Sequence, residues 1–556
     1  MKRIQFILTF TLLSLFLQLH GCKQNKGGEE QYTGPLFAEN IRTTGPLLPE
    51  EELQSLKVPE GFEIQLFASE PDIDKPMNMA FDAQGRMWVT QSFEYPFPKS
   101  PDVHGTDRLT ILEDTNGDGR ADKFTHVSDT LNIPIGVLPY HQGALTFSVP
   151  NLYQYSDGDQ NDKPEAMKVL FGPFGFQDTH GMVSNFFRGY DGWVYACHGF
   201  TNFSSIAGTD GDSIKMSSGN TFRFRLDGSR VEQTTFGQVN PFGLAMDEYG
   251  YVYSTDSHSS PLYQLIRGGD YPHFNKLEIM AFGPDMKSFE NEATALCGIA
   301  YYQDNQFPAD FQRNFFIGDA FNSRVHRYSW VWKGSSPVGK SEEDFVKSAD
   351  PWFRPVNVKM GPDGALYVAD FYNAIIGHYE VPLGHPKRDK KRGRIWRINY
   401  KGCLNNAANL ASMTADELLP LLDADNQTTR MLAADQLADR VGSSAVSGLQ
   451  SVLSNANTSP RQYMQALWVI FRLKSMDAAT IQKALAHADP LVRVHALRVL
   501  REWKHDGTIF YPLIKAATKD PDAHVQRIAT ELLMSYPVME SVVTVLDVMR
   551  QTGQAD

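Results

Sequence analysis

One segment of the sequence has acidic and amide side chains spaced as in a calcium-binding loop. It reads DTNGDGRAD over residues 114–122. Such loops place oxygen ligands at positions 1, 3 and 5, a glycine at position 6 and a backbone carbonyl at position 7. Positions 1, 3, 5, 6 and 7 are occupied here by Asp114, Asn116, Asp118, Gly119 and Arg120. The acidic residue Asp122, at position 9, replaces the usual glutamate at position 12. We predict a site for calcium or another hard cation here, with an Asx-rich turn as the alternative.

A weaker copy of this pattern follows at residues 156–165. Asp157, Asp159 and Asn161 have the right spacing, but no glycine stands where the loop must turn. In either loop we expect an ion to hold the backbone together rather than to act on a substrate.

A single histidine is the main candidate for acid–base chemistry. His180 lies in a glycine-containing stretch, QDTHGMVSNFFRGYDG, at residues 177–192. Free histidine has a pKa of about 6.5, which suits a general base at neutral pH. The alternative is a loop histidine with a structural role.

Polar residues also flank three apolar segments further along the chain. They are Asn240 in FGQVNPFGLAMD, Ser257 and His258 in STDSHSSP, and Arg354 in WFRPVNVKMGPDG. Each lies directly before or after a predicted strand, so their common position depends on how those strands are arranged.

Short β-strands are the elements expected to position these residues. From about residue 59 to 400 one unit recurs: an apolar residue, Asp, a turn that ends in Gly, and an aromatic-rich strand. This order is typical of β-hairpins. Six units, near residues 85, 143, 192, 250, 314 and 364, stand about 50–65 residues apart. The period predicts a six-bladed β-propeller over residues 55–400, in which such loops line a central funnel; β-sandwiches are the alternative.

Beyond about residue 410 the hydrophobic pattern becomes that of α-helices, with apolar residues at i, i+3, i+4 and i+7. Alanines at 433, 466, 496 and 529 recur at spacings of 33, 30 and 33 residues. This pattern predicts an all-α solenoid of about four HEAT-type repeats over residues 411–556. Such an array presents a docking surface to a protein partner or supports the propeller.

Charge and composition limit the partners. The chain has 52 Lys and Arg against 65 Asp and Glu, a net charge of −13, which argues against nucleic acid as a partner. At 42% hydrophobic and 21% charged residues over 556 positions, it has the composition of a multidomain globular protein. Residues 385–400 are locally basic, which is typical of a solvated strand and turn that close the propeller; a polyphosphate or membrane patch is the alternative.

The N-terminus resembles a bacterial lipoprotein precursor. Lys2 and Arg3 precede an apolar run, and LHGC ends at Cys22. We predict a signal peptide and lipobox over residues 1–22, lipidation of Cys22 and a flexible tether over residues 23–54. The protein is then exported and lipid-anchored in the cell envelope, with Lys23 favouring the outer membrane over the inner. An uncleaved anchor helix is the alternative.

The other three cysteines are Cys197, Cys297 and Cys403. None stands in a C-x-x-C pair, which excludes a zinc ribbon and covalently attached c-type haem. An odd number leaves at least one thiol unpaired, and we expect all three to be small buried residues.

The order of the motifs resembles the sorbosone/glucose dehydrogenase-like propellers. It runs from His180 and GYDGWVY through NPFGLA and CGIAY to FRPVNVKMGPDGALYVAD. The closest resemblance is to their membrane-bound, PVC-type branch, in which HEAT repeats and often a cytochrome c domain follow the propeller. The resemblance covers residues 55–550, and the cytochrome domain is missing from it.

This resemblance implies a quinone-dependent sugar dehydrogenase. His180 corresponds to the general base, which takes a proton from a sugar hydroxyl while hydride passes to calcium-held pyrroloquinoline quinone. Asn240 corresponds to a cofactor contact, and Arg354 to the first of two arginines below the cofactor. Ser257 and His258 match the loop whose carbonyls hold the cofactor's calcium.

Three positions depart from the pattern of this family. Val239, Phe321 and Val356 stand where the family has cationic residues, although Arg324 lies close to Phe321 in the sequence. Each lost charge-assisted bond to the tricarboxylate cofactor removes about 1.5–3 kcal/mol. With no C-x-x-C-H motif, electrons would pass to a separate cytochrome c or another acceptor.

Two functional hypotheses therefore stand. The first is a lipid-anchored dehydrogenase-like propeller that oxidises a sugar or related alcohol with a quinone cofactor. The second is a non-catalytic envelope lipoprotein that binds a glycan or protein, with the solenoid as docking surface. Lactone hydrolysis at a calcium site is a further alternative.

Overall fold

The computed structural model describes residues 41–552 except 160, 258–261, 274–284, 288–294, 376–380, 383, 404–406 and 537. The chain divides into two units, Met1–Glu39 and Asn40–Asp556. The predicted signal peptide, Cys22, the first part of the tether and His258 lie outside the described residues. Residues 49–55, most of which we assigned to the tether, form helix α2 (Pro49–Ser55).

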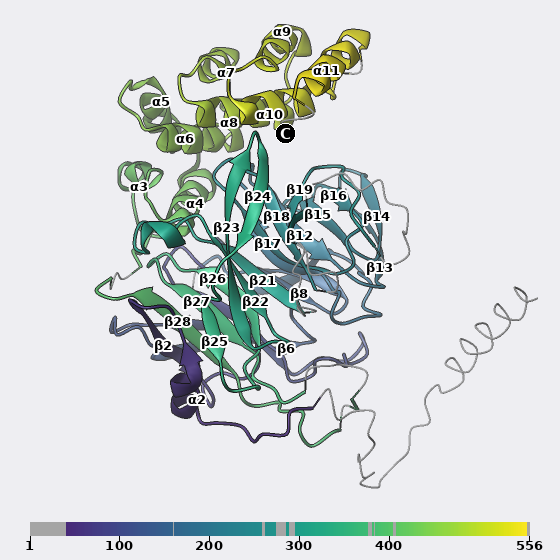
Figure 1. Ribbon diagram of the computed structural model, residues 1–556, viewed down its shortest axis with the longest axis vertical. Helices are drawn as coiled ribbons and strands as arrows, with labels where there is room; N and C mark the ends of the chain where they lie inside the picture. Colours follow the sequence, from purple (N-terminus) through teal and green to yellow (C-terminus); the bar gives the residue numbers. More distant parts are fainter. Residues whose placement is uncertain are drawn as a thin grey trace, which may run out of the picture. The chain divides into compact units, whose positions relative to one another are not determined.

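Six antiparallel sheets and one separate two-stranded hairpin make up the described N-terminal part (Figure 1). Their innermost strands contact one another in a closed cycle, β3–β7–β11–β17–β21–β26–β3. This cycle confirms the predicted six-bladed propeller, which leaves few exposed sheet edges. The first blade consists of β3 (Pro76–Phe81), β4 (Met87–Gln91), β5 (Asp107–Glu113) and β6 (Lys123–Leu131), and the second of β7 (Gly136–Tyr140), β8 (Gly143–Ser148), β9 (Asn151–Ser156) and β10 (Ala166–Phe171). The third consists of β11 (Ser184–Arg188), β12 (Val194–His198), β15 (Asn220–Phe224) and β16 (Val231–Phe236). The hairpin β13 (Phe203–Ala207) and β14 (Ser213–Ser217) lies outside these blades.

The other three blades follow the same meander with two additions. The last blade is completed by β2, which pairs with β28 and so joins the start of the propeller to its end. In the fifth blade, β1 (Leu56–Lys57) pairs with β25, and β24 (Ser336–Ser341) pairs with β23. The fourth blade consists of β17 (Pro241–Met246), β18 (Val252–Asp256), β19 (Leu262–Leu265) and β20 (Asp285–Lys287). The fifth consists of β21 (Leu296–Tyr301), β22 (Phe315–Asp319), β23 (Arg324–Lys333) and β25 (Val346–Ser348). The sixth consists of β26 (Pro355–Met360), β27 (Leu366–Asp370), β28 (Arg394–Tyr400) and β2 (Phe62–Ser69).

The recurring Asp–Gly unit is the turn between the first and second strands of a blade. In the sixth blade Gly364 has φ +82°, a conformation that favours glycine. Asp363 accepts hydrogen bonds from Ala365 N and from the hydroxyl of Tyr367, so the aspartate fixes the strand that follows. The sequence unit therefore predicts these hairpins for a local, physical reason.

α-Helices follow the propeller. Seven of them, α3, α4 and α6–α10, begin after a Thr, Asn, Ser or Asp whose side chain accepts a backbone N–H of the first turn. They are α3 (Ala415–Leu421), α4 (Gln427–Asp435), α5 (Val446–Ser454), α6 (Pro460–Arg472), α7 (Ala478–Leu485), α8 (Pro490–Glu502), α9 (Gly507–Ala517), α10 (Ala523–Leu533) and α11 (Met539–Thr552).

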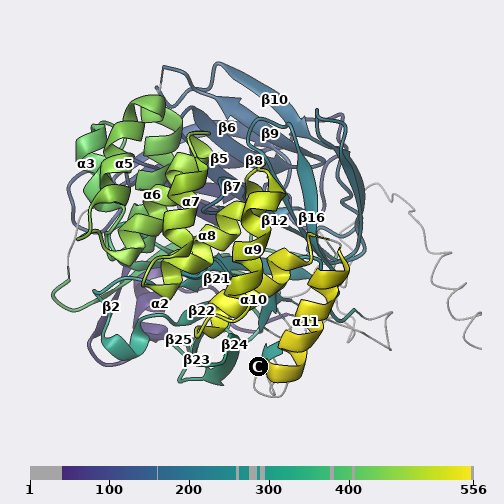
Figure 2. The same cartoon turned by 90° about the horizontal axis from the view of Figure 1, so that it is seen from above.

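The helices stack in two rows (Figures 1 and 2). Helices α4, α6, α8 and α10 contact one another in sequence and form the row next to the propeller. The periodic alanines lie in this row and are fully buried, namely Ala433, Ala466, Ala496 and Ala529. Assignment to the HEAT class stays a prediction. In the described part of the chain, none of the helices is long and apolar enough to cross a bilayer.

The helices cover the ends of the innermost strands. The side chain of Gln427 donates to Met246 O (3.1 Å), at the end of β17, and Thr428 Oγ1 donates to Met360 O (2.8 Å), at the end of β26. The beginnings of the same strands therefore lie at the other end of the propeller.

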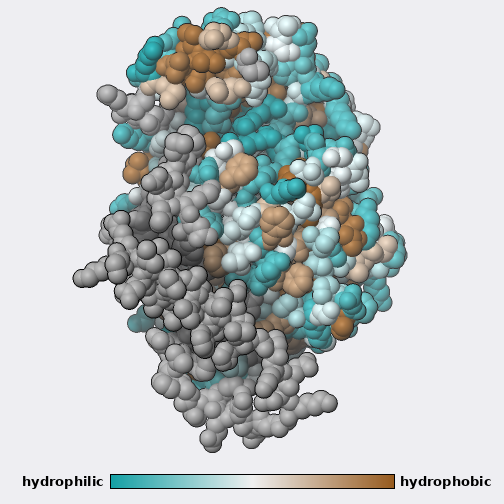
Figure 3. Space-filling view, turned by 90° about the vertical axis from the view of Figure 1, so that its right-hand side faces the viewer, coloured by the Kyte–Doolittle hydropathy of each residue, from teal (hydrophilic) through white to brown (hydrophobic). Residues whose placement is uncertain are grey.

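Hydrophobic side chains gather at the helical end of the molecule in Figure 3. Helix α11 exposes five of them: Met539, Val542, Val543, Leu546 and Met549. Cys197 and Cys297 are buried, Cys403 is half-buried, and all three thiols are free.

Candidate functional site

A cavity of about 360 Å³ lies at the beginnings of the innermost strands. His180, Asn240, Ser257 and Arg354 all line it. The structure thus brings together four of the five residues that the sequence placed around a cofactor, and the fifth, His258, lies outside the described residues. The remaining wall is largely apolar and includes Met77, Phe93, Tyr95, Ile135, Phe242, Phe321, Val356, Phe371 and Ile375.

In two blades, the aspartate that ends the second strand positions the polar residue that precedes the first strand. In the fourth blade Asp256 accepts a hydrogen bond from Asn240 N (2.9 Å). In the sixth blade Asp370 accepts one from Arg354 N (2.8 Å) in the same way. Neither aspartate was predicted as a site residue from the sequence, although each ends a strand as STD or VAD.

The loop of His180 depends on close backbone approach. A Cβ atom at Gly181 would lie 2.4 Å from the backbone N of Phe200, and one at Gly199 would lie 2.0 Å from the side-chain oxygen of Asn240. Glycine is therefore required at both positions. The amide of Asn240 lies 3.5 Å from the carbonyl of His180 and so connects two blades at the cavity.

The imidazole of His180 is partly exposed to the cavity. Its Nδ1 lies 3.6 Å from an oxygen of Asp178, and its side chain is 29% exposed. The ring of Tyr95 packs edge-to-face against it at 5.3 Å. Because Asp178 lies on the Nδ1 side of the ring, Nε2 is the nitrogen that points away from this carboxylate.

Arg354 is a buried cation without a carboxylate partner among the described residues. Its Nη1 donates to Ala320 O (3.0 Å) and to the hydroxyl of Ser323 (3.1 Å), whereas Nε and Nη2 are buried without a hydrogen-bond partner. Burial, and then repulsion by Arg42, lowers the pKa of Arg354 to about 9. Unmet guanidinium donors beside a cavity are suited to a carboxylate or phosphate ligand.

Ser257 contributes mainly through its backbone position. Its N–H donates to Asn240 O (2.9 Å), and its hydroxyl donates to Leu296 O (2.8 Å). The first bond ties the loop that follows β18 to the start of the same blade, and the second ties it to β21 of the neighbouring blade.

The departures from the family pattern are apolar in the structure as well. Phe321 and Val356 line the cavity, and Val239 is buried, with its N–H donating to Asp256. Arg324 does not replace the missing lysine, because its guanidinium pairs with Asp344 at 3.3 Å.

The basic segment supplies cations that the sequence analysis did not place at the site. Arg388 and Lys390 line the cavity, together with Asp389. Behind them the buried Lys75 donates to Phe371 O (3.0 Å) and lies 3.3 Å from Asp389. Burial lowers the pKa of Lys75 to about 8. The segment therefore does more than close the propeller with β28.

The predicted calcium loop lies away from this cavity. The carboxylate of Asp114 accepts N–H bonds from Gly117 and Gly119, and that of Asp122 accepts from Thr115. Gln65 of β2 donates to the carbonyl of Gly119 at 2.6 Å and attaches the loop to the last blade. These contacts are those of Asx turns, and calcium at Asp114, Asn116, Asp118, Arg120 and Asp122 stays a prediction.

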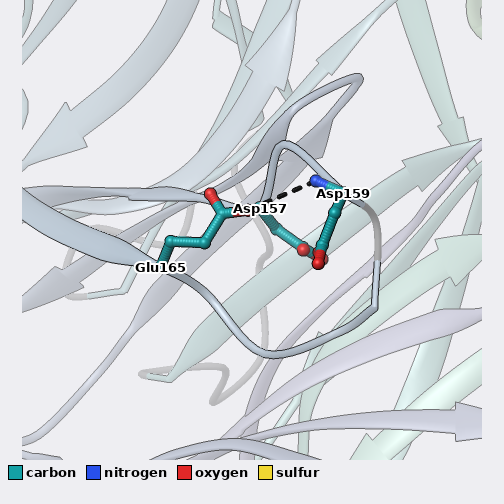
Figure 4. Close-up of side chains that lie close together, drawn as sticks. All are labelled: Asp157, Asp159 and Glu165. Atoms are coloured by element: carbon teal, nitrogen blue, oxygen red, sulfur yellow. Dashed lines mark hydrogen bonds between the residues drawn. The ribbon is translucent and has the colours of Figure 1, made fainter.

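The weaker loop has the closer set of acidic groups. Oxygens of Asp157, Asp159 and Glu165 lie within 4.8 Å of one another, and among the described residues this is the acidic group that could hold a metal ion (Figure 4). The sequence analysis did not identify Glu165 as a ligand, because it relied on the spacing of the first three positions.

Comparisons with known proteins give a family and several similar folds. The model of the family "Domain of unknown function (DUF7133)" matches residues 48–402. No curated protein matches the chain.

Several solved structures are similar to part of the chain at low sequence identity. An oxidoreductase (glucose dehydrogenase) of Thermus thermophilus is 13% identical, with a TM-score of 0.41 over 61% of this chain and 100% of the other. The pyrroloquinoline quinone-bound aldose sugar dehydrogenase of Streptomyces coelicolor is 15% identical, with a TM-score of 0.38 over 62% and 100%. The soluble aldose sugar dehydrogenase of Escherichia coli, in its apo form, is 17% identical, with a TM-score of 0.35 over 61% and 100%.

Proposed function

The chain belongs to the DUF7133 family, and we propose that its propeller is a dehydrogenase-like module that oxidises a sugar or related alcohol with pyrroloquinoline quinone. One observation carries this proposal: His180, Asn240 and Arg354, from three different blades, line one cavity. A partly exposed histidine and a buried, unpaired guanidinium at the same cavity supply a base and an anion site.

The residues present are compatible with the quinone, with fewer charges than the family pattern. The Nε and Nη2 groups of Arg354 are unmet donors for one of its carboxylates, and Asn240 lines the same cavity from another blade. Phe321 and Phe371 offer apolar surface for a flat ring system. Arg388 and Lys390 add positive charge at this wall.

The chain's own residues would bind and activate the substrate. When bound, the quinone supplies a two-electron acceptor for hydride. Nε2 of His180 accepts the proton of the substrate hydroxyl, and the carboxylate of Asp178 stabilises the resulting imidazolium, since it lies 3.6 Å from Nδ1. The apolar wall excludes water, which strengthens these electrostatic interactions.

Other parts of the proposal concern the setting of this site. We propose an exported, lipid-anchored protein that passes electrons to a separate acceptor, with the helices as a docking surface for a protein partner. A non-catalytic glycan- or protein-binding role is the second candidate, and the apolar Phe321 and Val356 at the cavity favour it.

Reconstitution tests the proposal directly. The purified protein is incubated with calcium and pyrroloquinoline quinone, and reduction of a dye is followed across a panel of sugars. We expect His180→Ala to lower the rate by about a hundredfold or more, because a general base contributes roughly 10²–10⁴.

The matched control is His104→Ala, which removes an exposed histidine. Dye reduction that is unchanged in His180→Ala contradicts the assignment of the base. Sugars that raise the melting temperature without any dye reduction support the binding role instead.

A further inference from the structure

The segment of residues 41–47 crosses loops of the fifth and sixth blades beside the cavity. Ile41 pairs with Ile375, which lines the cavity. Further along the segment, Thr44 O accepts a hydrogen bond from the indole of Trp352 (3.1 Å). Three further hydrogen bonds fix the course of this segment: Arg42 N to Ala374 O (2.8 Å), Leu47 N to Tyr372 OH (2.6 Å) and Lys387 Nζ to Arg42 O (2.9 Å).

This segment brings Arg42 to the blade-five wall of the cavity. Its Nη2 donates to Phe321 O (3.1 Å), and its guanidinium lies 5.9 Å from the ring of Phe321. Arg42 therefore stands behind Phe321, the residue at the position where the sorbosone/glucose dehydrogenase-like propellers have a lysine in the fifth blade. Nε of Arg42 is buried without a hydrogen-bond partner.

Arg42 and Arg354 act on the same place. Both donate to carbonyls of the 320–321 turn, and in the described part of the chain neither forms an ion pair with a carboxylate. Their positive charges are close enough that Arg42 lowers the pKa of Arg354. Arg354 is buried and Arg42 is half-buried, so their like charges and unmet donors are costly to desolvate, and an anionic ligand offsets that cost.

We propose that Arg42 is a positioning residue of the cavity, which together with Arg354 holds a carboxylate-bearing ligand at the wall between the fifth and sixth blades. Arg354 lines the cavity and contacts the ligand, whereas Arg42 acts through Phe321 and through its electric field. Arg42 thus compensates in part for the cations that are missing at Phe321 and Val356. Residues 41–47 precede the region 48–402 that the family model matches, so this contribution belongs to a segment outside it.

The carboxylate has two potential sources. One is the quinone cofactor, and the inference rests on the proposed function for that source alone. The other is an acidic sugar such as a uronic acid, which needs no quinone. Both share the chemistry that two guanidinium groups recognise.

Binding measurements on the full chain without added cofactor separate these sources. Calorimetric titrations with pyrroloquinoline quinone, with glucuronate and with glucose are carried out at low and high salt for the wild type, Arg42→Gln and Arg42→Lys. The matched control is Arg324→Gln, which removes a blade-five arginine that is paired with Asp344.

We expect Arg42→Gln to weaken binding of at least one of the two anions roughly tenfold, because a positive charge near the ligand is lost, and to reduce the salt dependence of the affinity. Arg42→Lys should recover most of the affinity, since it restores the charge. Arg324→Gln should bind as the wild type does, and the affinity for glucose should not change in any variant. Circular dichroism checks that each variant is folded.

Anion affinity and salt dependence that are unchanged in Arg42→Gln overturn the inference, even where sugar oxidation is intact. Equal losses in Arg42→Gln and Arg42→Lys also overturn it, because they indicate a structural role without charge recognition. Wild-type protein that binds neither anion overturns it as well. Binding of glucuronate but not of the quinone supports the inference and contradicts the proposed cofactor.

Discussion

Two buried arginines at opposite ends of the propeller show how the surroundings of one residue type separate structure from function. Arg223, at the helix-covered end, is 2% exposed, and Arg354, at the cavity, is 3% exposed. Arg223 lies 3.0 Å from Asp191, 2.6 Å from Glu232 and 3.0 Å from Glu502 of helix α8. Arg354 has no such partner among the described residues.

The two side chains therefore have opposite electrostatic states. Burial alone would lower the pKa of Arg223, but the surrounding acidic groups raise it above its usual value. At Arg354 burial and Arg42 act in the same direction and lower the pKa to about 9. A paired buried arginine joins propeller to helices, whereas an unpaired one beside a cavity is suited to a ligand.

The largest effect is expected at the paired arginine. Arg223→Ala leaves the buried carboxylates of Asp191 and Glu502 without this cation, and it should lower the free energy of unfolding by about 3–5 kcal/mol. Urea denaturation followed by circular dichroism measures this loss. Arg230→Ala, at a half-exposed arginine of the same blade, should cost less than about 0.5 kcal/mol. Equal losses of stability in both variants would show that the buried ion pairs of Arg223 contribute no more than those of a half-exposed arginine.

The second-largest effect is expected from acid, which should lower the free energy of unfolding through a buried histidine at the helix-covered end. The ring of His495 accepts a hydrogen bond from Trp468 Nε1 (2.8 Å) at Nδ1 and donates from Nε2 to Glu248 O (2.7 Å), which keeps it neutral. Burial lowers its pKa to about 3. Because this folded-state pKa lies below the unfolded value, the unfolded chain binds the proton first, and stability falls as the pH drops below about 6.5.

Between pH 6.5 and 5 this histidine should remove roughly 1.5 kcal/mol from the free energy of unfolding. Urea midpoints at several pH values test it, with His495→Gln as the reference variant. An identical pH dependence in both proteins would show that His495 does not contribute.

At the cavity the corresponding substitution should not lower the stability. Arg354→Met removes a buried charge that has no carboxylate partner among the described residues, so the free energy of unfolding should stay the same or rise by about 1–4 kcal/mol, while the affinity for an anionic ligand falls roughly tenfold or more. Calorimetry and urea denaturation on the same variant separate the two effects. A loss of stability as large as that of Arg223→Ala would show that Arg354 is structural.

The pH dependence sharpens this prediction. The folded-state pKa of Arg354 lies below the ordinary value of arginine, so the unfolded state holds more protons above about pH 9. The stability of the wild type should therefore rise relative to Arg354→Met between about pH 8 and 10.5. Parallel curves over this range would contradict a charged, strained Arg354.

Calcium should have the smallest effect. The loops at residues 114–122 and 157–165 are already held by hydrogen bonds of their own, so calcium should raise the melting temperature by about 2 °C or less. Asp118→Ala should abolish the shift if the first loop binds. A shift that persists in Asp118→Ala and disappears in Asp159→Ala would assign the ion to the second loop.

The local features of the fold were predictable from the sequence. The Asp–Gly turn units near residues 85, 192, 250 and 364 correspond to hairpins between the first and second strands of blades. The periodic alanines lie buried in one row of helices. Each pattern depends on residues close together in the chain, where turn geometry and helical periodicity leave a clear mark.

The site was predictable only in part. His180, Asn240 and Arg354 were identified because they stand beside recognisable strand motifs. Arg42 was not, because its segment carries no motif and was assigned to the tether. Lys390 was not placed either, since a basic run is equally typical of a solvated turn.

By itself the sequence determined that this chain alternates turns and strands into six blades, adds helices, and carries a histidine and an arginine beside strand starts. These properties follow from local backbone preferences and hydrophobic periodicity. Only the tertiary structure decided that Arg354 is buried without a carboxylate partner in the described part of the chain and that Arg42 stands near it, while Arg223 is paired with three carboxylates. Burial and pairing depend on groups that are distant in the chain. The same residue type therefore links the propeller to the helices at one end of the propeller and forms a candidate ligand site at the other.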